Sequence, residues 1–234
     1  MANSEIAYNS VNSFCPILYS VVTFSFNATR PDPEPSKPPA GSVSYLIRSA
    51  QFPDLINVAD ILTESFHSQE GMNCWLKPVF RLGIYEDLRT RLRSNSTHYI
   101  CLVAIAPDPP NRPGAYSPIV ATVEMAVKSP SLGQEISTRC LYLSNLAVSP
   151  LYRRQGIALK LLHRCEEIAR EWGFNDLYLH VLENNQPAKR LYFHRGYRLK
   201  YIEPYWMSWL FWRPRRMLLH KSLPSKALRA GNRE

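Results

Sequence analysis

The stretch SPLYRRQGIALKLL, residues 149–162, joins a hydrophobic run to an amphipathic one through two arginines and a glycine. A helix that begins near Gly156 leaves its first backbone N–H groups without intrahelical partners, at the positive end of the helix dipole, which is where proteins bind anions. Gly156 has no Cβ and Ala158 is small, so a phosphate could approach the backbone, while Arg153 and Arg154 add positive charge. A plain strand–loop–helix junction with solvated arginines explains this stretch alone equally well.

Other familiar sites are missing from the sequence. There is no G-x-x-x-x-G-K-[S/T] and no G-x-G-x-x-G, so neither a Walker-type nucleotide site nor a dinucleotide fold is indicated. The six histidines include no H-E-x-x-H, and the five cysteines include no C-x-x-C. We therefore expect no metal and no disulfide scaffold, and we expect a reducing compartment.

The composition is that of a globular protein with a strong positive charge. Hydrophobic residues make up 45% and charged residues 20%, and the formal net charge is +9. This balance favours anionic partners such as a phosphorylated cofactor, an acidic peptide or nucleic acid. No helix has an unbroken basic face and no RNA-binding aromatic motif occurs, so no nucleic acid partner is expected. No apolar run reaches about 18 residues, so no membrane span is expected either.

Three regions follow from the pattern along the chain. Residues 1–41 are rich in Asn, Ser and Pro and end in RPDPEPSKPPAG, which predicts a disordered, proline-rich extension. Residues 42–222 carry the alternating hydrophobic runs of a folded domain, and residues 223–234 form a polar, basic tail.

Within the folded region, strand and helix patterns alternate, which predicts an α/β fold with a mixed sheet. The helix that starts at 52–54 takes Asp54 as its N-cap, and the helix after Gly156 is expected to end at Gly173. The expected strands are 43–50, 98–106, 118–127, 139–148, 176–182, 197–204 and 216–223. The expected helices are 52–66, 85–94, 157–172 and 185–196.

The motifs around the opening stretch resemble one known family. Arg153-x-x-Gly156-x-Ala158 is similar to the [R/Q]-x-x-G-x-[G/A] signature of GCN5-related N-acetyltransferases (GNAT). LYLSNLAVSPLYRRQGIA resembles that family's central strand and pyrophosphate loop, and LYLHVLENNQPAKRLYFHRGYRL resembles its next strand and N-x-x-A helix. The resemblance implies the GNAT fold, a mixed sheet of about six to seven strands flanked by about four helices, with acetyl-CoA as co-substrate.

The same resemblance implies how acetyl-CoA is held. The pyrophosphate would lie on the loop that opens with Arg153, and the amide-rich pantetheine arm would pair with a strand edge. Asn185 would hydrogen-bond the pantetheine arm, or cap the following helix, or do both. The implied pyrophosphate residues are Arg153, Arg154, Gln155, Gly156, Ile157 and Ala158, and the implied pantetheine residues are Leu146, Ala147 and Val148.

Three further residues are candidates for the chemistry. Tyr192 lies where the family often carries a general acid that protonates the leaving thiolate; otherwise it is a core aromatic. Tyr142 and His180 lie where some N-terminal acetyltransferases carry a pair that removes the proton of the acceptor amine; otherwise His180 makes one structural hydrogen bond. Glu124 is a weaker alternative base.

The segment EPYWMSWLFWRPRR, 203–216, is unusually aromatic. In the family this connection borders the acceptor site, where aromatic rings could hold a peptide. A hydrophobic flap over the sheet, or a contact between two copies, is favoured slightly for most of these rings. The protein is therefore expected to be a monomer or a homodimer.

The expected activity is transfer of an acetyl group to a primary amine, either a protein N-terminal α-amine or a lysine. The alternatives are acetylation of a small amine (a polyamine, aminoglycoside or metabolite) and a non-catalytic acyl-CoA sensor. The stretches TESFH, LGIYEDLRTRL and YICLVAIA also resemble acetyltransferases of cyanobacteria and plastids, of which plastid members can modify both amine types. Arg30 is the only basic residue before Lys37, which favours a bacterial cytoplasm, cyanobacteria included, over the alternative of the plastid stroma.

Overall fold

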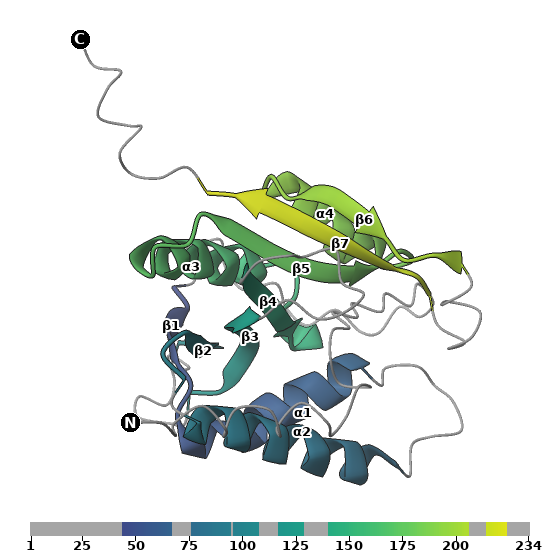
Figure 1. Cartoon of the computed structure of the whole chain (residues 1–234). Helices are drawn as coiled ribbons and strands as arrows, with labels where there is room; N and C mark the ends of the chain where they lie inside the picture. Colours follow the sequence, from purple (N-terminus) through teal and green to yellow (C-terminus); the bar gives the residue numbers. More distant parts are fainter. Residues whose placement is uncertain are drawn as a thin grey trace, which may run out of the picture.

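The computed structural model describes residues 44–66, 76–94, 96–107, 117–128, 140–205 and 214–223. These residues form a seven-stranded sheet in the order β1-β2-β3-β4-β5-β7-β6, in which only β4 and β5 are parallel (Figure 1). The expected mixed sheet with four helices is confirmed. The strands are β1 Leu46–Ser49, β2 Tyr99–Ile105, β3 Ile119–Lys128, β4 Cys140–Val148, β5 Asp176–Leu182, β6 Arg198–Ile202 and β7 Arg216–Ser222. The helices are α1 Leu55–Phe66, α2 Lys77–Arg93, α3 Ile157–Glu171 and α4 Gln186–His194.

The helices cover the sheet in two layers (Figure 1). α3 and α4 lie on one face, where the apolar stripe of α3, including Leu161 and Cys165, packs on Leu141 and Leu143 of β4. α1 and α2 cover the β1–β4 part of the other face. Side chains alternate between the layers along β4, but the phase shifts near Asn145: Leu141, Leu143, Leu146 and Val148 lie in the α3 layer, and Ala147 lies in the α1–α2 layer.

β4 and β5 separate halfway along their length. They pair only from Leu141 to Leu143 of β4, whereas the rest of β5 pairs with β7 alone. At the point of separation Asn145 has a left-handed backbone, φ 53°, and the β3–β4 ladder is irregular between Thr122 and Glu124. An irregularity of this kind bends a strand away from its neighbour. The backbone of β4 beyond Asn145 thus faces a gap on its β5 side.

The helix ends are set by a few residues. Asn185 caps α4, because its side-chain oxygen accepts a hydrogen bond from Ala188 N at 3.2 Å. Gly156 and Gly173 both have φ 78° and stand directly before and just after α3, so the expected end at Gly173 is confirmed. Left-handed backbone of this kind favours glycine.

Two sequence expectations were wrong in detail. A 3₁₀ turn, Phe52–Asp54, precedes α1, and Asp54 is not the N-cap; its carboxylate accepts from Gln51 N and Arg48. α2 begins at Lys77, eight residues before the expected start, because only two of its side chains are buried and the periodic signal is weak. The domain limits, the proline-rich extension, the basic tail and residues 206–213 of the aromatic segment lie wholly or partly outside the described residues and stay predictions.

Candidate functional site

The gap between β4 and β5 holds the residues expected to bind the pantetheine arm. On its other edge β4 is paired with β3, through Ala147 to Thr122 and Val148 to Ala121. No β5 residue pairs with Leu146, Ala147 or Val148. On this side the β4 backbone beyond Asn145 has no strand partner, which is the kind of edge that an extended, amide-rich ligand joins as an added strand.

The β4–α3 junction lies at the end of this gap. The first intrahelical bond of α3 runs from Lys160 N to Gly156 O, so the N–H groups from Gly156 to Leu159 have no acceptor within the helix. Arg154, with φ 66°, Gln155 and Gly156 are exposed at the same place. This arrangement offers several backbone donors and one arginine to an anion.

The contacts of three residues of the junction add to what the sequence predicted. Arg153 is not a rim charge alone: its Nε donates to Val148 O at 3.0 Å, and burial lowers the pKa of its guanidinium. Gly156 is required by its positive φ, because a Cβ built there meets no protein atom within 4 Å. Gln155 is held from the side, since Tyr45 donates its hydroxyl hydrogen to the Gln155 side chain.

Tyr142 and His180 lie together beside the start of the gap. The Tyr142 hydroxyl is 2.6 Å from Nδ1 of His180, and the two rings are 5.7 Å apart. Tyr142 is 2% exposed and His180 is partly exposed. The expected juxtaposition of this pair is therefore present in the structure, whereas its chemical role stays a prediction.

Sequence reasoning missed Lys128. The amine of this residue lies 3.4 Å from the centroid of the Tyr142 ring. The pKa of this amine is lowered to about 7, mainly by burial and further by the positive charges of Arg91 and Arg216. The Lys128 side chain lies beside Tyr142 and His180 only because of the register between β3 and β4, which the sequence pattern does not reveal.

Tyr192 is a buried residue of α4 and packs edge to face against Tyr197, with ring centroids 5.7 Å apart. Burial, and then the nearby Tyr142, raise the pKa of Tyr192 well above its ordinary value. The phenol therefore carries its proton at neutral pH, as a general acid must before the reaction. Tyr142 is close enough to influence it electrostatically, although the two side chains come from different layers.

Glu124, the alternative base, is fully occupied. This buried carboxylate accepts hydrogen bonds from Arg91 at 2.9 Å, from Tyr99 at 3.0 Å and from the Asn145 side chain. Asn145 is the residue with φ 53° where β4 leaves β5. Glu124 thus stabilises the bend of β4, which is a structural role.

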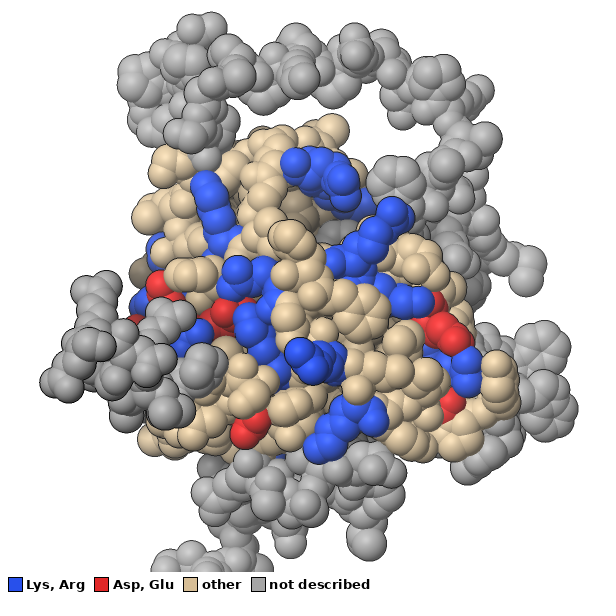
Figure 2. Space-filling model, turned by 90° about the horizontal axis from the view of Figure 1, so that it is seen from above, with Lys and Arg blue, Asp and Glu red and all other residues tan. Residues whose placement is uncertain are grey.

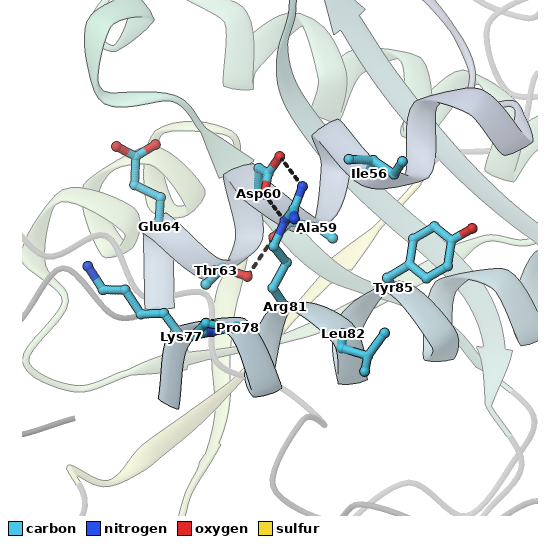
Figure 3. A pocket seen from close by; sticks show the side chains of 10 residues that line it. All are labelled: Ile56, Ala59, Asp60, Thr63, Glu64, Lys77, Pro78, Arg81, Leu82 and Tyr85. Carbon is cyan, nitrogen blue, oxygen red and sulfur yellow. Dashed lines mark hydrogen bonds and ion pairs between the residues drawn. The ribbon is translucent and has the colours of Figure 1, made fainter. Parts of the chain in front are cut away.

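The described residues also form a cleft away from this group, between α1 and α2 (Figure 3). It has a volume of about 660 Å³ and is lined mainly by apolar surface, with the ion pair of Asp60 and Arg81 across it. None of the candidate residues named above lines it. We therefore place the candidate site at the β4–β5 gap and not in this cleft.

One face of the molecule carries mainly basic side chains, which suits a ligand of negative charge. Figure 2 shows basic side chains spread over one face of the molecule, with fewer acidic ones among them. Within the described part of the chain no helix is long and apolar enough to span a membrane. In the same residues no group of three or more His, Cys, Asp or Glu side chains could hold a metal ion.

Comparison with known proteins places the fold. The model of the acetyltransferase (GNAT) family matches residues 72–197. GCN5-related N-acetyltransferase 7, chloroplastic, of Arabidopsis thaliana is 38% identical over 87 residues, which are 37% of this chain and 32% of that protein. GCN5-related N-acetyltransferase 10, chloroplastic, of the same plant is 40% identical over 81 residues, 35% of this chain and 32% of that protein. The matched segment thus spans about a third of the length of these relatives.

Solved structures are similar in fold at low sequence identity. The PaiA N-acetyltransferase of Thermoplasma acidophilum, in complex with coenzyme A, has a TM-score of 0.57 and 18% identity, covering 76% of this chain and 99% of that one. Arabidopsis thaliana NAA60, in complex with a bisubstrate analogue, has a TM-score of 0.55 and 17% identity, covering 78% and 100%. At such identities the similarity concerns the fold alone.

Proposed function

Because this chain belongs to the acetyltransferase (GNAT) family, we propose that it transfers the acetyl group of acetyl-CoA to a primary amine of a protein, either an N-terminal α-amine or a lysine. The observation that carries this proposal is the open edge of β4 leading to the uncapped N-terminus of α3. One side of the gap can hold an amide-rich arm, and its end can hold a diphosphate.

In this proposal acetyl-CoA lies along β4 and ends at α3. The N–H groups of Gly156, Ile157 and Ala158, with Arg154 and Gln155, bind the pyrophosphate. Leu146, Ala147 and Val148 bind the pantetheine arm through their backbone, and one N–H there polarises the thioester carbonyl. Arg153 anchors the loop to the end of β4, and Asn185 caps α4.

The proposed chemistry divides between two groups. The Tyr142–His180 pair accepts the proton that the acceptor amine must lose before it attacks the carbonyl carbon. Tyr192 then donates its proton to the thiolate as the carbon–sulfur bond breaks. Burial raises the pKa of Tyr192, which by itself makes it a weaker acid. The thiolate formed in the same low-dielectric surroundings also binds a proton more tightly, so the two effects partly cancel.

The charges around Tyr142 and His180 favour a protein acceptor over a polycationic small molecule. Among the described residues, the buried acids Glu124 and Glu203 are both paired, Glu124 with Arg91 at 2.9 Å and Glu203 with Arg216 at 2.5 Å. A polyamine or aminoglycoside would need acidic partners to offset its several charges. The presence of both Tyr192 and His180 favours an enzyme over a non-catalytic acyl-CoA sensor.

The names of the two Arabidopsis relatives bear on where the protein works. Both relatives are described as chloroplastic. They support the plastid stroma, the alternative expected from the sequence, over a bacterial cytoplasm, and we propose the plastid location for this protein.

The function is tested by incubating the full-length protein with labelled acetyl-CoA and three acceptor sets: peptides with a free α-amine, N-terminally blocked peptides with one lysine, and polyamines. The proposal expects label in one or both peptide sets and little in the polyamines. Label in the polyamines alone would replace the protein acceptor by a small amine. Binding of acetyl-CoA without any transfer would favour the sensor.

The pyrophosphate position is tested by Gly156→Ala. Its φ of 78° is unfavourable for alanine, so we expect a loss of about 1 to 2 kcal/mol in unfolding free energy. The new methyl group would also stand where the diphosphate approaches, so calorimetry should show coenzyme A binding weakened at least about tenfold.

Gly173→Ala is the matched control, because Gly173 has the same φ of 78° and likewise no atom within 4 Å of a built Cβ. It should lose similar stability in a urea titration and keep its affinity for coenzyme A. Equal affinities of the two variants would mean that the diphosphate does not lie against Gly156.

A further inference from the structure

Lys128 is the last residue of β3, and its side chain lies on the ring of Tyr142. The 3.4 Å between its Nζ and the ring centroid is a direct contact, well inside the range of about 6 Å over which a cation is attracted to an aromatic face. The register explains the contact: Ala126 pairs with Tyr142 and Lys128 with Cys140, so Lys128 is the diagonal neighbour of Tyr142 on the same face.

Tyr142 in turn contacts His180 on the next strand, β5. The Tyr142 hydroxyl is 2.6 Å from Nδ1 of His180, which is the diagonal neighbour of Tyr142 on β5, two residues beyond its partner Tyr178. Lys128, Tyr142 and His180 therefore form one row across three adjacent strands. Tyr142 is in the middle of this row and is 2% exposed, so its ring is held by what touches it.

The surroundings of Lys128 make its positive charge costly. Burial lowers the pKa of its amine most, to about 7, and the positive charges of Arg91 and Arg216 lower it further. A hydrophobic side chain of similar length would avoid this cost, and amines perturbed in this way are concentrated at functional sites. In the described part of the chain, the titratable and charged groups that face this row include Arg91 from α2, Glu124 from β3, Cys140 from β4, Tyr192 from α4 and Arg216 from β7.

We propose that Lys128 is a positioning residue for the Tyr142–His180 pair, an inference that rests on the proposed acetyl transfer. Its amine holds the Tyr142 ring with the hydroxyl toward His180, and its positive charge strengthens that hydroxyl as a hydrogen-bond donor to Nδ1. A proton then passes from the acceptor ammonium to the Tyr142 oxygen while the Tyr142 proton passes to Nδ1 of His180. The amine nitrogen is left with the electron pair that forms the new bond to the acetyl carbon.

Two substitutions of Lys128 separate its charge from its size. Lys128→Met keeps the length and removes the charge, and at pH 6, where the parent amine is charged, we expect kcat for peptide acetylation to fall about tenfold, an effect of the order of one strengthened charge-assisted hydrogen bond. The affinity for coenzyme A, measured by calorimetry, should not change. Lys128→Arg keeps a cation and should retain most of kcat at pH 7.

Lys200→Met is the control for a lost lysine–tyrosine contact. Lys200 lies over the ring of Tyr178, with 4.9 Å between its Nζ and the centroid, but it is exposed and Tyr178 is not part of the row. Its kcat should equal that of the parent.

The pH profile distinguishes positioning by charge from a structural role. The parent amine is charged below its pKa of about 7 and loses its charge as the pH rises through that value, whereas arginine stays charged. The ratio of kcat for Lys128→Arg to kcat for the parent should therefore rise between pH 6 and pH 9.

A parent that acetylates peptides, together with a ratio that stays flat over this range, would contradict the inference while leaving the proposed function intact. Should Lys128→Met fail to fold, the ratio decides alone. A parent that transfers no acetyl group to any amine would contradict the proposed function, and the role of Lys128 with it.

Discussion

Tyr192→Phe is expected to lower kcat about a hundredfold, which corresponds to about 2.7 kcal/mol in the activation barrier, because general acid catalysis contributes roughly 10² to 10⁴ in rate. The ring of Tyr192, a residue of α4, is buried in the core, and phenylalanine fills the same space. Folding and coenzyme A affinity should therefore be preserved. Steady-state kinetics with the acceptor peptide measures kcat, and calorimetry with coenzyme A measures its affinity.

Tyr197→Phe is the matched control for this loss. Tyr197 is also buried, its ring is 5.7 Å from that of Tyr192, and its hydroxyl has no hydrogen-bond partner among the described residues. Removal of an unpaired buried hydroxyl should leave stability unchanged or slightly higher, and kcat unchanged. Equal kcat values for the Tyr192→Phe variant and the parent would remove Tyr192 as the acid.

His180→Ala is expected to lower kcat/KM about a hundredfold at and below pH 7, and less at higher pH. An α-amine has an ordinary pKa of about 7.7 to 8.0, so below that range the acceptor is mostly protonated and needs a base. Above it the free amine is already present, and the base contributes less. The measurement is the ratio of kcat/KM for parent and variant from pH 6 to pH 9 with a peptide that carries a free N-terminus.

His220→Ala controls for the loss of a strand histidine. His220 is partly exposed on β7, lies 2.6 Å from a carboxylate oxygen of Asp176 and is not part of the Tyr142–His180 pair. Its kcat/KM should follow the parent across the range. A His180→Ala profile parallel to the parent at every pH would exclude His180 as the base, even if the overall rate were lower.

The sheet and helices could largely be predicted from the sequence because their signals are local. Each of these signals lies within a few residues of chain: the apolar stripe of α3, Gly173 after the end of α3, and the pattern of the strand 176–182. α2 was predicted too short, because a mostly exposed helix carries little hydrophobic periodicity.

The parts of the site that could not be predicted depend on pairing between distant strands. The bend of β4 requires Glu124 and Arg91 to meet Asn145, three residues from three elements. Lys128 reaches Tyr142 only because of the β3–β4 register, which a single sequence does not determine. The motif located the loop before α3, but it did not reveal that Gly156 also has a left-handed backbone, φ 78°.

The central claim is that the backbone N–H groups at the start of α3 bind the diphosphate of acetyl-CoA. Calorimetry on the unmodified protein with coenzyme A, dephospho-coenzyme A and pantetheine tests it most directly. Coenzyme A and its dephospho form both keep the diphosphate and should bind with similar affinity at one site, whereas pantetheine should bind at least about tenfold more weakly. Pantetheine binding as tightly as coenzyme A, or no heat with any of the three, would contradict the account.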